Sequence, residues 1–266
     1  MRVQPVKLSS RASAIVVAAG VLMLACAVPA QADQRDEFLA GRSVDCAGCD
    51  LSHAELKRRD LAGANLEGAN LSDATLHEAN LSGANLKGAT LTGANLNLAD
   101  LRRSNLAGAD ISGALAYGAN FANADLSGAV MKEIKLQTAD LTGAKLPGAN
   151  LQNADLRLAR AARADFSNAI IAYVEADRFH ASDANLSGAN LYFSVLPEAE
   201  FRNVDLTGAN LAGTNFLRAN LSRARLDRAD LRQAYLMQSI MTDATTDGAI
   251  WEKTTLPDGT VYPTGN

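Results

Sequence analysis

The chain has 266 residues, a formal net charge of −4, 48% hydrophobic residues and only 5% aromatic residues. A conventional globular core of this size relies on aromatic side chains, but the whole chain contains only one Trp, five Tyr and seven Phe. Most of the apolar content is Ala and Leu. The chain is not strongly basic, which argues against nucleic-acid binding.

Residues 1–32 have the features of a secretory signal peptide. Three basic residues precede an uncharged apolar stretch over 14–28, and Ala30-Gln31-Ala32 supplies the small residues that a signal peptidase requires. The apolar stretch is shorter than the roughly 20 residues that span a bilayer. We therefore predict a periplasmic or secreted protein that is not stably inserted in a membrane. A retained N-terminal anchor and lipidation at Cys26 are the alternatives.

A single five-residue period runs through most of the chain. Every fifth residue from Leu51 to Met241 forms one column of 39 positions, the Leu column, in which 35 residues are Leu, Ile, Met or Phe. Two residues earlier lies a second column, the Ala column, with Ala at 29 of 38 positions from Ala54 to Ser239. The residue between the columns is usually Asn or Asp. The exceptions in the Leu column are Ala116, Ala161, Ala176 and Ala181.

This period fits neither standard secondary structure, because helical burial repeats about every 3.6 residues and strand burial about every 2. The Leu column would spiral around a helix and alternate between the two faces of a strand. A backbone that turns in the same sense after every five residues brings each Leu inward from one side of a coil. Gly, Asn, Asp and Ser are expected to supply the turns.

The A-(N/D)-L-x-x pattern closely resembles the pentapeptide-repeat family, over roughly residues 50–245. The resemblance implies an all-β solenoid, a right-handed quadrilateral parallel β-helix with coils of 20 residues. About ten coils spaced about 4.8 Å apart would form a rod roughly 45–50 Å long. Leu51, Leu71 and Leu91 would then stack in one internal ladder.

Both ends of such a rod need covering, because an open β-helix exposes unpaired strand edges. A short helix is expected near the N-terminus, and Trp251 with Tyr262 is expected to cover the last coil. Some members of the family dimerise end to end, so the resemblance leaves both a monomer and an end-to-end homodimer open. The predicted organisation is a signal peptide over 1–32, an N-terminal cap or linker over 33–45, the β-helix over 46–245 and a C-terminal cap over 246–266.

The pattern is weakest over 158–183. Val174 and Phe179 are large members of the Ala column that directly precede alanines of the Leu column, so large and small side chains exchange places. Ala161 has no such partner. Tolerated repacking, a groove for a partner and a short helix over 157–163 are the open interpretations.

Cys46 and Cys49 form the most specific local motif and fall in the Leu and Ala columns. Both are therefore expected to face inward across one turn, whose ends lie within about 7 Å, a separation that overlaps the range for disulfides. We predict a structural disulfide, with buried thiols or a redox-active pair as alternatives. Asp50 stands where covalent haem attachment requires His, and a zinc site would need further ligands.

No catalytic constellation stands out. His53, His77 and His180 occupy different positions of the five-residue frame, and Ser, Asp and Gly recur throughout as turn residues. The frame also contains no loop insertion that could carry catalytic groups. We predict a non-enzymatic protein without a cofactor or a metal.

Five arginines near the C-terminal end of the repeats are the candidate patch for an anionic partner. The 20-residue coil spreads them over several faces, so a solvated surface is the favoured alternative. These residues are Arg218, Arg223, Arg225, Arg228 and Arg232.

These observations predict a non-catalytic structural or protein-binding scaffold in the periplasm or outside the cell, with an unknown protein or envelope component as partner and no nucleic acid. The alternative rests on the resemblance, because some pentapeptide-repeat proteins mimic duplex DNA and bind DNA gyrase. That function requires a cytoplasmic location, which the predicted signal peptide opposes. Cleavage of the signal removes three positive charges and takes the net charge from −4 to −7, but interspersed arginines imitate continuous phosphate poorly.

Overall fold

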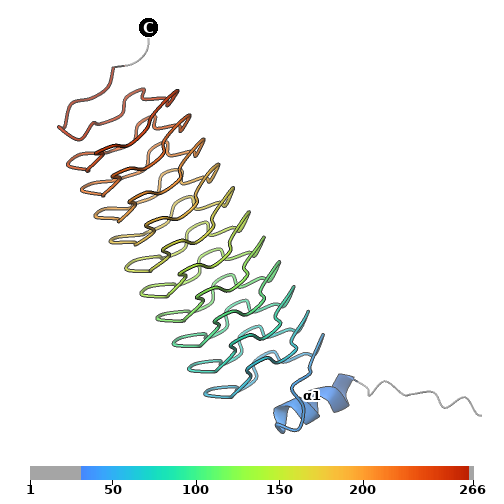
Figure 1. The fold of residues 1–266 in the computed structure, drawn as a ribbon. Helices are drawn as coiled ribbons and strands as arrows, with labels where there is room; N and C mark the ends of the chain where they lie inside the picture. The colour runs from blue at the N-terminus through green and yellow to red at the C-terminus, as the bar shows by residue number, and fades with distance from the viewer. Residues whose placement is uncertain (1–30, 264–266) are drawn as a thin grey trace, which may run out of the picture.

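The computed structural model describes residues 31–263 and shows a rod of stacked coils that begins at helix α1 (Figure 1). Helix α1 spans Gln31–Leu39. From Asp45 to Thr255 the backbone repeats one five-residue pattern with two turn residues and one residue in a β-bridge. Within residues 31–263, no helix is both long and apolar enough to cross a membrane.

Parallel bridges join each bridging residue to the residue 20 positions later, from the Asp45–Asn65 pair to the Tyr235–Thr255 pair. Because one bridge recurs at every fifth residue, each 20-residue coil has four sides. The described β-structure of the coils consists of isolated bridges rather than extended strands. The sides are this short because four of every five residues belong to a turn.

Each corner is a four-residue turn that starts in the Leu column and ends in the Ala column. The N–H of Ala64 donates to the carbonyl of Leu61 at 3.0 Å, and the same bond recurs along the rod. The third residue of the turn has a positive φ, which glycine adopts without strain, as at Gly63 (+66°). Other residues also occupy this position, for example Arg103 at +57°.

The Asn or Asp between the two columns satisfies a backbone donor in the turn. The N–H of Leu51 donates to the carbonyl of Asn70 in the next coil at 2.7 Å. The N–H of Ser52 instead donates to Oδ1 of Asp50 at 3.1 Å. The sequence preference for Asn and Asp therefore has a hydrogen-bonding cause, in addition to the turning role predicted from the sequence.

Both columns face the interior of the rod. Leu51, Leu71 and Leu91, which the sequence analysis placed in one ladder, are each completely buried. Stacking therefore buries side chains that a single coil would leave exposed.

The coil runs without a bulge through the weakest part of the pattern, and the helix considered over 157–163 does not form. Phe179 is buried and packs edge-to-face between Phe166 and Phe201, with ring centroids 6.4 and 6.1 Å away. Ala161, five residues before Phe166, is completely buried. Aromatic rings beside the alanines therefore keep this part of the core filled.

Helix α1 closes the N-terminal end of the rod. Phe38 is completely buried and belongs to the same hydrophobic core as the coils. Arg59, which interrupts the Ala column, donates from its guanidinium to the carbonyls of Leu39 (2.8 Å) and Phe38 (3.0 Å). The predicted signal peptide over 1–32 lies almost entirely outside the described residues.

The C-terminal end is covered on one side only. Bridging continues past the predicted domain boundary to Thr255, and the tail then folds back so that the Tyr262 N–H donates to the Thr254 carbonyl at 2.8 Å. The rings of Trp251 and Tyr262 lie 6.3 Å apart. Met241, on another side of the last coil, remains only partly buried. The two aromatic residues therefore cover less of this end than the sequence predicts.

Candidate functional site

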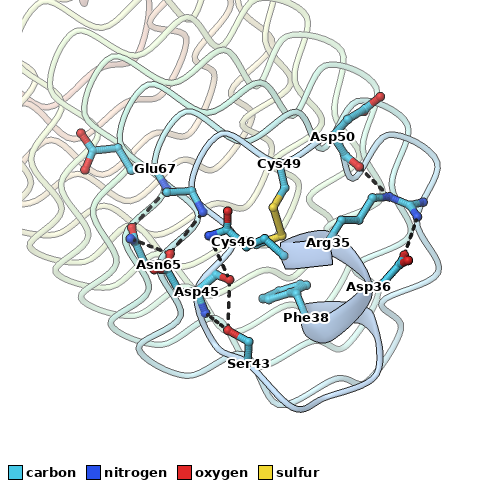
Figure 2. Close-up of a disulfide and its surroundings, with 12 residues drawn as sticks. Arg35, Asp36, Phe38, Ser43, Asp45, Cys46, Cys49, Asp50, Asn65 and Glu67 are labelled. Atoms are coloured by element: carbon cyan, nitrogen blue, oxygen red, sulfur yellow. Dashed lines mark hydrogen bonds and ion pairs between the residues drawn. A yellow bond between two sulfur atoms is a disulfide. The ribbon is translucent and has the colours of Figure 1, made fainter. Parts of the chain in front are cut away.

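Cys46 and Cys49 are joined by a disulfide, with their Cα atoms 5.2 Å apart and both side chains completely buried. Figure 2 shows the bond beside Phe38 of α1. The N–H of Cys46 donates to the carbonyl of Asn65 at 2.8 Å, which joins this turn to the next coil. Burial between α1 and the coil suits a structural bond better than a redox-active pair, which needs access to its partners.

Polar contacts hold α1 over the disulfide-bonded turn. Nε of Arg35 donates to the backbone carbonyl of Asp50 at 2.8 Å (Figure 2). The pKa of the Asp50 carboxyl is held below its ordinary value, chiefly because the side chain and backbone N–H of Ser52 hydrogen-bond to its charged form. Helix α1 is thus fastened to the first coil by the Arg35 contact as well as by the burial of Phe38.

The structure does not bring the five candidate arginines together. Four of them lie at four different corners of the coil, and Arg225 lies on a side. All five are exposed, and four have a carboxylate within 4 Å. The ion pairs are Arg218–Glu198, Arg223–Asp243, Arg225–Asp205 and Arg232–Asp230. Their charges are therefore dispersed and largely compensated.

The histidines are also separate. His53 Nδ1 lies 3.8 Å from the Asp73 carboxylate and His77 Nε2 lies 3.0 Å from that of Glu78, whereas His180 forms a bridge on another side. Within residues 31–263, no three or more His, Cys, Asp or Glu side chains are grouped to hold a metal ion.

The structure contains an exposed aromatic cluster at one corner that was not predicted from the sequence. Tyr173, Tyr192 and Phe193, here called the aromatic corner, have ring centroids 4.6–6.4 Å apart. Tyr173 and Phe193 are 49% and 46% exposed. They are 20 residues apart, so they occupy the same turn position in adjacent coils. The signal in the sequence is the 20-residue spacing of Tyr173 and Phe193, which equals the length of one coil.

The backbone beneath the aromatic corner is also unusual. Val174 occupies the Ala column, and its N–H donates to the Ser194 hydroxyl at 3.2 Å rather than to a carbonyl of its own turn. The Ser194 hydroxyl in turn donates to the carbonyl of Ile171 at 2.7 Å. One hydroxyl therefore links the two coils that carry the three rings of the aromatic corner.

Comparison with known protein families identifies the repeats. The family model described as pentapeptide repeats matches eight copies, which together cover residues 49–171 and 184–243. This is more than half of the chain, so the chain belongs to the pentapeptide repeat family. Proteins of this family are typically non-catalytic.

The solved structure of HetL gives the same assignment of the fold. HetL, a pentapeptide repeat protein involved in heterocyst differentiation regulation from the cyanobacterium Nostoc, is 30% identical with a TM-score of 0.55, covering 87% of this chain and 98% of its own. A pentapeptide repeat protein from the thylakoid lumen of Arabidopsis thaliana is 25% identical, with a TM-score of 0.31 and coverage of 37% and 65%. Full-length QnrB1, a plasmid-mediated fluoroquinolone resistance protein, is 22% identical, with a TM-score of 0.27 and coverage of 70% and 90%. No curated protein matches the chain.

Proposed function

We propose that the chain is an exported, non-catalytic scaffold of the periplasm or the extracellular space, and that its C-terminal edge docks another protein. The observation that carries this proposal is the contrast between the two ends of the rod. Helix α1 buries the N-terminal end, whereas the last coil leaves part of its core and backbone accessible.

Unpaired backbone donors mark this edge. In inner coils the N–H groups of the Leu column donate to the next coil, as Leu221 does to the Ile240 carbonyl at 2.7 Å. At the end of the described chain, the N–H groups of Met241 and Thr246 have no backbone acceptor among residues 31–263. Exposed strand edges pair readily with another chain.

Apolar side chains lie next to these donors. Ile240 and Ile250 are 51% and 47% exposed, and Met241 and Trp251 are only partly buried. Apolar surface combined with a free edge favours a protein partner, since both features become buried on docking. The partner is either a second copy, giving an end-to-end homodimer, or an unidentified protein or envelope component.

Export is supported by two features of the sequence and structure. The signal-like segment over 1–32 precedes the rod, and the buried Cys46–Cys49 disulfide suits an oxidising compartment. We further propose that the mature rod is right-handed and contains about ten coils, as the family's fold implies.

A charge placed at the edge tests the scaffold function. Thr246→Lys should prevent pairing, because lysines protect open sheet edges, whereas Thr92→Lys at an exposed corner in the middle of the rod is the matched control. Sedimentation velocity and pull-down from envelope extracts should show a dimer or a captured protein that is lost in the first variant and retained in the control. Identical behaviour of the two variants would reject the docking edge.

Gyrase binding is the alternative function, and location distinguishes it from the scaffold function. The ion pairs formed by arginines of the last coils interrupt any acidic surface that could imitate phosphate, which weakens this alternative. Cell fractionation with N-terminal sequencing should find the cleaved chain in the periplasm or the medium. Uncleaved chain in the cytosol would instead favour gyrase.

A further inference from the structure

A hollow of about 340 Å³ lies beside the aromatic corner. It forms because Ala212 and Gly213 occupy a corner between Tyr192 and Phe193 of the preceding coil and two longer residues of the following coil. Gly213 is essential to this shape, because a Cβ there would come within 2.8 Å of the Phe193 ring. Its φ of +68° also favours glycine. The residues that line the hollow are Tyr192, Phe193, Ala212, Arg232, Gln233 and Glu252.

The aromatic wall is a group of contacting rings in different planes, and the Phe193 ring, which is 46% exposed, is here called the platform. Tyr192 packs edge-to-face against Phe193 and Tyr173, with centroids 4.6 and 5.7 Å apart, and Tyr173 is stacked with Phe193 at 6.4 Å. Rings that contact one another leave no space between them for a cation, so they do not form an aromatic cage. Their negatively polarised faces can instead stack on polarised C–H groups of a ligand.

The opposite wall is polar. Among residues 31–263, neither the Gln233 amide nor the Glu252 carboxylate has a side-chain hydrogen bond, so both can bond to a ligand. The Arg232 guanidinium is occupied by Asp230, with Nη2 and Oδ2 2.5 Å apart. Because Arg232 is compensated and Glu252 is negative, the hollow is unsuited to an anionic ligand.

We propose that this hollow binds a neutral saccharide. One sugar ring presents C–H groups to the face of Phe193 or Tyr192, and its hydroxyls bond to Gln233 and Glu252. A sugar ring combines an apolar face with hydroxyls along its edge, which suits an aromatic wall opposite a polar wall, and the volume lies within the range of small-molecule sites. Glu252 directly follows Trp251 of the docking edge, but Phe193→Ala alters only the hollow and Thr246→Lys only the edge, so the two proposals can fail separately.

Direct titration of the full mature protein tests this site. Cellotetraose, maltotetraose and chitotetraose are titrated by calorimetry and by saturation-transfer NMR. At least one should bind, and Phe193→Ala should weaken it at least tenfold, because the variant removes the platform. Tyr117→Ala is the matched control, since Tyr117 is another exposed aromatic at a corner (53% exposed) and should leave binding unchanged.

Variants of the polar wall keep the test independent of the platform. Gln233→Ala and Glu252→Gln should each weaken binding, because a site built for hydroxyls loses affinity when a bonding partner is removed. Thermal melting confirms that each variant folds. No binding by any of the three sugars would overturn the proposal, as would binding that survives Phe193→Ala. Binding of a deca-proline peptide in their place, lost in Phe193→Ala, would overturn it and assign the platform to peptides.

Discussion

At the scale of single residues, a buried member of the Leu column contributes far more to stability than an exposed side chain. Leu106 is completely buried, whereas Lys87 is exposed. Leu106→Asp should lower the free energy of unfolding by at least about 3 kcal/mol, because it removes apolar burial and leaves a carboxylate unpaired in the core. Lys87→Asp should change it by less than about 0.5 kcal/mol. Urea denaturation of both variants checks this, and equal destabilisation would count against the buried column.

The two columns could be predicted because each position has one role that repeats along the chain. Individual roles outside the columns could not. In the sequence, Arg59 only interrupts the Ala column. The structure shows that its guanidinium bonds to the backbone carbonyls at the end of α1. The aromatic corner depends on the alignment of Tyr173 with Phe193 at the 20-residue coil length, which the family resemblance implies but the five-residue period alone does not contain. Side chains that act between coils are therefore invisible to a five-residue pattern.

At the scale of the turn, an Asp between the two columns links stability to pH. The pKa of the Asp125 carboxyl is held below its ordinary value, chiefly because the Ser127 hydroxyl donates to its charged form at 2.5 Å. A carboxyl with a lowered folded-state pKa stabilises the fold above its unfolded-state pKa. This contribution is lost as the pH falls through the folded-state pKa.

Asp125→Asn tests this linkage, because the amide retains an oxygen that can accept from Ser127. The variant should fold and should show a smaller loss of unfolding free energy than the wild type as the pH falls below about 4. Urea denaturation at pH 7 and pH 3 provides the comparison. A pH dependence identical to that of the wild type would show that this carboxylate does not contribute.

At the scale of the first coil, the disulfide should stabilise one end rather than the whole rod. Closing the short loop between Cys46 and Cys49 is worth about 2 kcal/mol by loop entropy. In a solenoid each coil contacts mainly its neighbours. The double variant Cys46→Ser/Cys49→Ser should therefore accelerate amide hydrogen exchange around residues 46–65 and leave coils beyond residue 105 unchanged. Uniform acceleration along the chain would contradict this local effect.

At the scale of the whole molecule, the rod follows from one repeated turn, whereas its two ends differ in how they are covered. The sequence predicted that both ends would be covered, yet α1 closes one end and the tail covers only one side of the other. The five-residue pattern cannot predict this difference, because it reflects only the contacts between neighbouring coils. The segments that cover the two ends lie outside the pattern. The candidate binding features lie where the repeat is interrupted, at the aromatic corner and at the last coil.

The central claim is that the backbone returns to the same side after every 20 residues. Asn85 and Asn105 bridge adjacent coils, where Cα atoms about 4.8 Å apart suit a disulfide, whereas Asn95 lies on the opposite side. Oxidation of Asn85→Cys/Asn105→Cys should give an intramolecular cross-link within one chain, and Asn85→Cys/Asn95→Cys should not. Efficient cross-linking of the second pair, or failure of the first, would contradict the square coil.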